Sequence, residues 1–152
     1  EIRIVEVGSK IDLARKLITM NNLYGGQHRP EFVLLGAHGQ EMTVSLGAYS
    51  DQGVLQGKDI SPGVAARLDE ILAPNAKIIL DSCSTGAEGG IASQVASVLG
   101  RTVIAPSSPG SLKEVTITEG GDGMDFDVIF NRNFWSEPGV VYSGNEPLQP
   151  RG

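Results

Sequence analysis

Up to residue 108, short apolar runs alternate with amphipathic helical segments, and this alternation limits the fold of the chain more than any other feature. Such alternation is typical of an α/β domain with a mainly parallel sheet flanked by helices. We expect strands at residues 2–7, 32–35, 77–80 and 102–108, and helices at residues 10–20, 61–73 and 88–100. The 152 residues suit one domain with one hydrophobic core and with helices on both faces of the sheet.

Several local signals fix the ends of these elements. Ser9 is expected to cap the first helix, Ser61 followed by Pro62 begins the second, and Gly100 ends the third. The strand at residues 32–35 is apolar throughout, which predicts cover on both faces. In the first helix Ile11, Ala14, Leu17 and Ile18 share one face.

Two further regions follow a different pattern. Residues 40–59 alternate in polarity between glycine turns, so we expect a small hairpin or excursion there. Residues 114–131 predict two strands around a Gly-Gly-Asp-Gly turn, and residues 134–152 predict a short strand and a polar tail.

Composition excludes several functions. A net charge of −6 and a pI near 4.8 disfavour nucleic-acid or anionic-lipid partners. No run reaches the roughly 18 apolar residues of a membrane span. The chain starts at Glu1 within an expected strand, which we interpret as a fragment of a longer protein. Its compartment stays open, with a cytoplasmic location slightly favoured.

Two chemically useful side chains follow two of the expected strands. His38 stands in "LLGAHGQ" and Cys83, the single cysteine, in "ILDSCSTG". Parallel strands place their carboxyl ends at one edge of the sheet, where ligands bind. A thiol and an imidazole at that edge form a nucleophile and a general acid/base, and the N–H groups of Gly39 and Cys83 could hold an oxyanion. A lone cysteine is more often buried and inert, but its pairing with histidine at a strand end favours function.

The segments "GAHG" and "DSCSTG" resemble the histidine and cysteine signatures of the caspase-like cysteine peptidases, a group that includes metacaspases, clostripain and the bacterial CHAT domains. The resemblance covers residues 2–107 and is closest to metacaspases. It implies a caspase–hemoglobinase fold, a dyad of His38 and Cys83, an oxyanion donor at Gly39, and a peptide or protein substrate. The family sheet normally begins with one more strand and helix. The resemblance therefore implies that a complementary chain or segment supplies a missing strand.

Asp81 precedes Cys83 by two positions, so both should point to the same side of their strand, with Ser82 pointing to the other. A carboxylate there can pair with a substrate Arg or Lys, as the resemblance to metacaspases and clostripain implies. The alternative is that Asp81 caps the following turn. We therefore expect a cysteine endopeptidase that cleaves after Arg or Lys and processes itself or a partner.

Other functions remain as alternatives. A caspase-like scaffold without turnover would not need both dyad residues, and a different thiol hydrolase would want an acid or amide to orient His38. We expect no cofactor and no resident metal. The acids Asp122, Asp125 and Asp127 could bind calcium, but acids are also common in hairpin turns.

Overall fold

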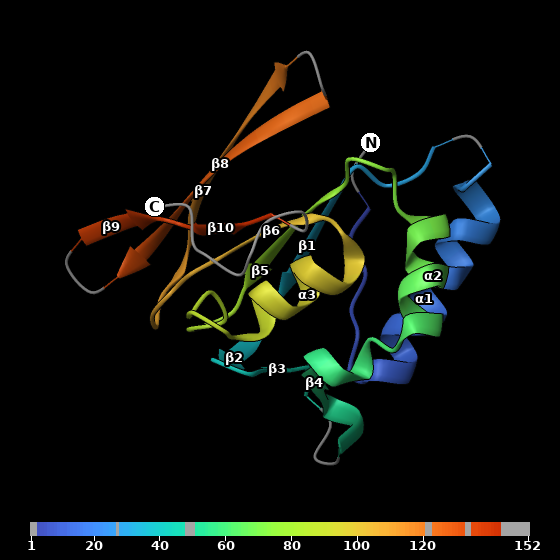
Figure 1. The fold of residues 1–152 in the computed structure, drawn as a ribbon, viewed down its shortest axis with the longest axis horizontal. Coiled ribbons are helices and arrows are strands. Elements are labelled where there is room, and N and C mark those ends of the chain that lie inside the picture. The colour runs from blue at the N-terminus through green and yellow to red at the C-terminus, as the bar shows by residue number, and fades with distance from the viewer. Residues whose placement is uncertain (1–2, 27, 48–50, 121–122, 133–134, 144–152) are drawn as a thin grey trace.

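The computed structural model of the chain describes residues 3–26, 28–47, 51–120, 123–132 and 135–143 (Figure 1). The helices are α1 (Lys10–Tyr24), α2 (Pro62–Ile71) and α3 (Ile91–Leu99), with the short 3-10 helices η1 (Asp51–Gly53) and η2 (Gly57–Asp59). The strands are β1 (Phe32–Gly36), β2 (His38–Gln40), β3 (Thr43–Ser45), β4 (Val54–Gln56), β5 (Lys77–Asp81), β6 (Thr102–Ala105), β7 (Ser111–Gly120), β8 (Gly123–Arg132), β9 (Trp135–Pro138) and β10 (Val140–Tyr142). No helix among the described residues is long and apolar enough to cross a membrane.

The central sheet has the order β1-β5-β6-β10. Its first three strands are parallel and β10 is antiparallel to β6. The register pairs Leu35 with Leu80 and Gly36 with Asp81, so β1 and β5 end at the same level. This confirms the predicted parallel pairing of these two strands. The molecule is a mixed α/β fold with a mostly parallel sheet.

The helix boundaries follow the predicted signals. The Ser9 hydroxyl accepts a hydrogen bond from the Asp12 N–H at 3.1 Å, and the Ser61 hydroxyl accepts one from the Val64 N–H at 3.2 Å. At the other end of α3, Gly100 adopts a left-handed conformation with φ of 62°, which glycine tolerates without strain.

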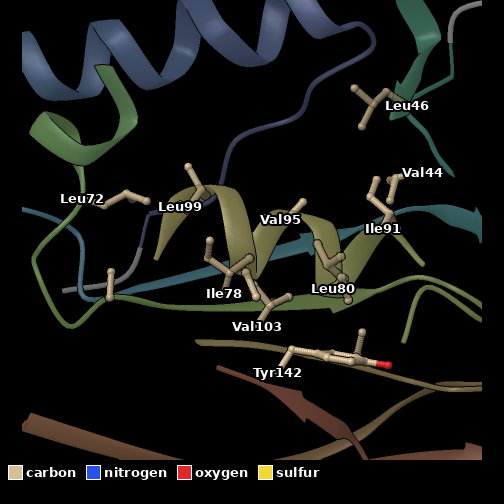
Figure 2. Close-up of a cluster of buried hydrophobic side chains, with 14 residues drawn as sticks. Val44, Leu46, Leu72, Ile78, Leu80, Ile91, Val95, Leu99, Val103 and Tyr142 are labelled. Carbon is tan, nitrogen blue, oxygen red and sulfur yellow. The ribbon is translucent and has the colours of Figure 1, made fainter. Parts of the chain in front are cut away.

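All three helices contribute to the apolar cluster on one face of the sheet. Alternate residues of β5 and β6, among them Ile78, Leu80 and Val103, point into this cluster, and α3 supplies most of the helical partners (Figure 2). Tyr142 of β10 completes it with a side chain that is 1% exposed. The apolar face of α3 therefore holds this helix directly on the sheet.

A β-hairpin covers the opposite face. Ile79 and Ile104 point away from the helices and contact Val128 and Phe130 of β8. Phe32 stacks on Phe126 with ring centroids 5.0 Å apart. The prediction of helices on both faces is therefore wrong, because the paired strands β7 and β8 bury this side. Their hairpin is the one expected at residues 114–131, and it is longer than predicted.

Two expectations near the amino-terminal end are also wrong. Residues 3–7 form no strand, although residues 5–7 line a hollow of about 390 Å³ together with residues 34–37 and Leu46. Leu34 is 44% exposed, so β1 is not covered on both faces. No residue of α1 is fully buried, and both Ile11 and Ile18 are exposed. Among the described residues, no strand pairs with the outer edge of β1.

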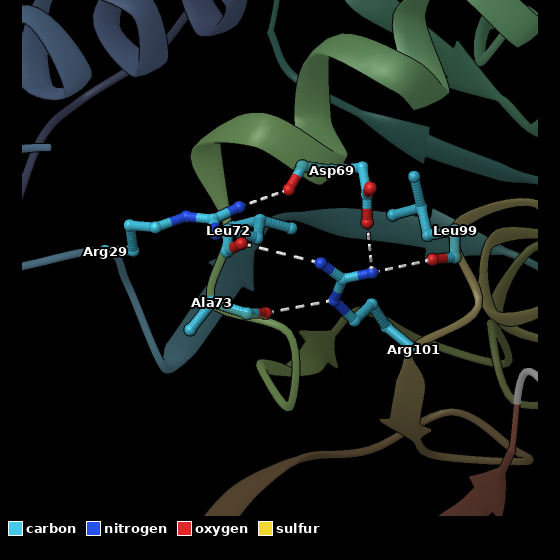
Figure 3. Close-up of polar contacts among 6 residues, drawn as sticks. All are labelled: Arg29, Asp69, Leu72, Ala73, Leu99 and Arg101. Atoms are coloured by element: carbon cyan, nitrogen blue, oxygen red, sulfur yellow. Dashed lines mark hydrogen bonds and ion pairs between the residues drawn. The ribbon is translucent and has the colours of Figure 1, made fainter.

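Arg101 joins α2 to the strand that follows α3. Its guanidinium donates to the carbonyl oxygens of Leu72, Ala73 and Leu99 and forms an ion pair of 2.8 Å with Asp69 (Figure 3). The side chain is only 7% exposed, so these acceptors replace the water that it loses on folding. The network satisfies the carboxyl-terminal carbonyls of both helices.

Candidate functional site

The chain turns sharply where β1 ends, and this turn sets one wall of the site. The Ala37 N–H donates to the Asp81 carbonyl at 3.2 Å, which extends the β1–β5 pairing by one step. The three-stranded antiparallel sheet β2-β3-β4 follows and confirms the predicted excursion. It begins at His38, so the histidine lies directly beyond the carboxyl end of β1.

Gly39 packs against the turn that carries Cys83. A Cβ added to Gly39 would lie 2.7 Å from Ser82 Cβ, 2.9 Å from Thr85 Cγ2 and 3.0 Å from the Cys83 carbonyl oxygen. Contacts this short exclude any side chain at this position. The backbone on both sides of His38 therefore touches residues 81–85, and the structure brings His38 and Cys83 to one edge of the sheet.

The turn after β5 presents Cys83 near its tip. Thr85 closes the turn, because its hydroxyl donates to the Ser82 carbonyl at 2.7 Å and its N–H donates to the same oxygen at 3.3 Å. Ser84 has φ of 61°, a conformation that a non-glycine residue adopts at a cost of roughly 1–3 kcal/mol. His38 is exposed and Cys83 is half-buried, so reagents in solution can reach both.

Asp81 and Cys83 face the same side of β5, as their spacing predicts. Both contact the start of β7: the Cys83 thiol donates to the Gly110 carbonyl at 3.6 Å, and Asp81 Oδ1 accepts from the Leu112 N–H at 3.0 Å. The carboxylate thus holds a strand rather than capping the turn that follows it. Ser82 faces the opposite side and is 1% exposed, which confirms its predicted packing position.

Several residues of this site carry no clear sequence signal. Tyr142 donates from its hydroxyl to the Gly86 carbonyl at 2.7 Å, and burial, with the nearby charge of Glu88, raises the pKa of this phenol. Thr85 and Gly110 also contact the site from segments that look like ordinary turns. The one sequence signal is Gly86, because a glycine in a turn suggests that another part of the backbone comes close. The structure agrees, since a Cβ on Gly86 would lie 2.5 Å from the Ala105 carbonyl oxygen.

The predicted metal candidates lie elsewhere. Asp122 is outside the described residues, the side chain of Asp125 is not described, and Asp127 is exposed on β8. Among the side chains that the structure describes, no three His, Cys, Asp or Glu residues are grouped to hold a metal ion. His28 is exposed in the loop before β1.

The fold and the site define an α/β domain with a cysteine and a histidine at the carboxyl edge of a mostly parallel sheet. Residues 19–118 match the model of a family described as a domain of unknown function, DUF8616, and the chain belongs to that family. The match includes both strand ends and the excursion between them. No curated protein and no solved structure matches the chain.

Proposed function

We propose that this protein is a cysteine endopeptidase of the caspase-like type, with His38 and Cys83 as its dyad. The observation that carries the proposal is the close packing of Gly39 on the Cys83 turn, which brings the backbone of the segment with His38 against the turn that carries the thiol. The parallel pairing of β1 with β5, which puts both strand ends at the same level, gives further support. The substrate is a peptide or protein.

The reaction follows from the chemistry of these groups. The Cys83 sulfur attacks the carbonyl carbon of the scissile bond, and the N–H groups of Gly39 and Cys83 stabilise the resulting oxyanion. His38 passes the thiol proton to the leaving amine, and water then hydrolyses the thioester. The Cys83 thiol must first leave the Gly110 carbonyl, to which it donates in the free protein.

The proposed specificity is for Arg or Lys before the scissile bond. Asp81 supports it, because its carboxylate lies on the same side of β5 as the Cys83 thiol. Oδ1 is held by Leu112, while Oδ2 lies 3.8 Å from the position of a Cβ on Gly36, where glycine leaves room. A substrate guanidinium or ammonium can approach this second oxygen.

A protein-interaction module without turnover is the second candidate, and the open edge of β1 favours it. Leu34 is 44% exposed and Ile4, in the neighbouring extended segment, is 90% exposed. Within the described residues β1 pairs only with β5, so its outer backbone groups can accept another strand. A complementary chain or segment that supplies such a strand is compatible with either candidate.

Two experiments test the proposed activity. A peptide electrophile carrying Arg should label Cys83 faster than one carrying Asp, as measured by intact-protein mass spectrometry. Cys83→Ala should abolish cleavage of Arg- and Lys-containing peptides while shifting the melting temperature by no more than 2–3 °C, which is about 1 kcal/mol at this chain length. Equal labelling by both electrophiles would remove the basic-residue preference. Retained cleavage by Cys83→Ala would overturn the peptidase assignment.

A further inference from the structure

We infer that Thr85 is a positioning residue of this site, which sets the spacing between the His38 strand end and Cys83. This inference deepens the proposed function and rests on it for the kinetic part of its test. Thr85 is fully buried and stands two residues after Cys83, yet it touches both halves of the site.

The hydroxyl of Thr85 controls the Cys83 side. Its Oγ1 donates to the Ser82 carbonyl at 2.7 Å inside the turn, a shorter contact than the 3.3 Å from its own backbone N–H. The turn also contains the strained Ser84, with φ of 61°. A strained conformation persists only where its surroundings enforce it. The Thr85 hydroxyl closes this turn from the side chain, so it fixes the path of the backbone after β5 and with it the position of Cys83.

The methyl group of Thr85 contacts the part of the site that carries His38. Its Cγ2 lies 2.9 Å from the position of a Cβ on Gly39, so it forms part of the surface on which Gly39 rests. His38 is the residue directly before Gly39. A shift of this surface therefore moves the histidine relative to the thiol, and displacement of about 1 Å can cost roughly a hundredfold in rate.

Thr85 is itself anchored to the core. Its carbonyl accepts from the Ala92 N–H of α3 at 3.0 Å, and the neighbouring Gly86 donates to the Pro106 carbonyl at 2.8 Å. The Gly86 carbonyl in turn accepts from Tyr142. The central sheet and α3 thus hold Thr85 in place, and Thr85 transmits that rigidity to both reacting groups.

The test removes each half of the side chain separately. Thr85→Val keeps the methyl group and loses the hydroxyl, whereas Thr85→Ser keeps the hydroxyl and loses the methyl group. Ser93→Ala is the matched control, because Ser93 is fully buried and also donates from its hydroxyl to a carbonyl three residues earlier, that of Gly90, at 2.8 Å. Thr85→Val and Ser93→Ala each remove one buried hydroxyl and its hydrogen bond to a carbonyl, and Thr85→Ser removes one buried methyl group, so comparable losses of melting temperature are expected.

The kinetic readout separates positioning from stability. Thr85→Val should lower kcat tenfold or more and leave KM within about threefold. Thr85→Ser should lower kcat less, and Ser93→Ala should leave kcat within twofold. If Thr85→Val and Ser93→Ala lose melting temperature and kcat to the same degree, Thr85 is structural only and the inference is overturned.

A second readout does not require peptidase activity. Alkylation of Cys83 with iodoacetamide should shift the NMR signal of the His38 ring in the parent protein, and this response should shrink by at least half in Thr85→Val. If the parent protein cleaves no peptide but shows this difference, the proposed function fails and the positioning role stands. An undiminished His38 response in Thr85→Val would overturn the positioning role, whatever the activity.

Discussion

Asp81 serves two purposes at the scale of single residues. Its backbone ends β5 and pairs with Gly36 of β1, while its side chain accepts the Leu112 N–H at 3.0 Å. A carboxylate that receives a backbone N–H is oriented by it, which fixes where its other oxygen points. The same contact means that removing the side chain affects the start of β7 as well as any bound substrate.

Substitution of Asp81 by Asn and by Ala separates these purposes. Asp81→Asn keeps an acceptor for the Leu112 N–H and loses the charge. The transition state for cleavage after Arg should therefore lose stabilisation, by no more than roughly 2–5 kcal/mol, and kcat/KM should fall accordingly. The thermal stability of the protein should be nearly retained. Asp81→Ala also leaves the Leu112 N–H unpaired, which should cost about a further 1–3 kcal/mol of folding stability. Steady-state kinetics on matched peptides with Arg or norleucine, together with melting curves, measure both effects. Equal losses on the two peptides would exclude Asp81 as the specificity residue.

At the scale of elements, α1 combines an apolar contact with a polar one, since Leu13 packs on the core cluster while no residue of the helix is fully buried. Lys10 forms an ion pair of 3.1 Å with Asp59 of η2, and each side chain is 23% exposed. Burial raises the pKa of Asp59, but the Gln56 N–H and the Lys10 ammonium outweigh it and lower the pKa below its usual value of 3.8. The ionised form of this carboxylate therefore strengthens the contact between α1 and η2.

This contact makes the stability of the domain depend on pH. Since folding lowers the pKa of Asp59, its contribution is complete above about pH 4 and is lost as pH falls through the lowered pKa. Lys10→Gln should weaken this dependence, because it removes one cause of the lowered pKa. Urea unfolding followed by circular dichroism from pH 6 to pH 2.5 tests this. If the parent protein and Lys10→Gln show the same pH dependence, Lys10 is not the partner that matters.

At the scale of the whole molecule, helices and a hairpin cover opposite faces of the central sheet, and no described strand pairs with the outer edge of β1. β10 is the other edge strand, and β7, β8 and β9 form a separate sheet that packs on one face of the central sheet. Figure 1 shows α1 and α2 together on one side of the molecule, with the β7–β8 hairpin projecting on the other. An exposed apolar strand edge tends to pair with other chains. The exposed Leu34 and Ile4 mark this edge.

We expect the isolated chain to self-associate through β1 at high concentration. Leu34→Lys should suppress this association, because it places a charge on the open edge. Val98→Lys is the matched control, since Val98 on α3 is also 44% exposed and lies away from that edge. Sedimentation velocity over a hundredfold range of concentration measures the difference. Association that is unchanged by Leu34→Lys, or reduced equally by both substitutions, would contradict pairing at β1.

Much of the fold could be predicted from local patterns. Ser9, Ser61 and Gly100 mark helix ends through hydrogen bonds and dihedral angles that depend only on neighbouring residues. The parallel pairing of β1 with β5 followed from the short apolar runs and the helix between them. The positions of His38 and Cys83 at one edge followed from the same topology. These features are local, or are related to local ones by general rules of connection.

The tertiary structure alone decided which surfaces are covered. Residues 3–7 have the sequence of a strand but form none. A strand exists only where its backbone groups pair with a neighbouring strand, and the sequence of the segment alone does not decide whether it has such a neighbour. Likewise, only the folded chain places a hairpin instead of a helix over Ile79 and Ile104, and Thr85 between Gly39 and Cys83. The sequence determined the elements and the two reactive side chains, since these depend on local chemistry. Contacts between distant segments decided the cover of the sheet and the spacing within the site.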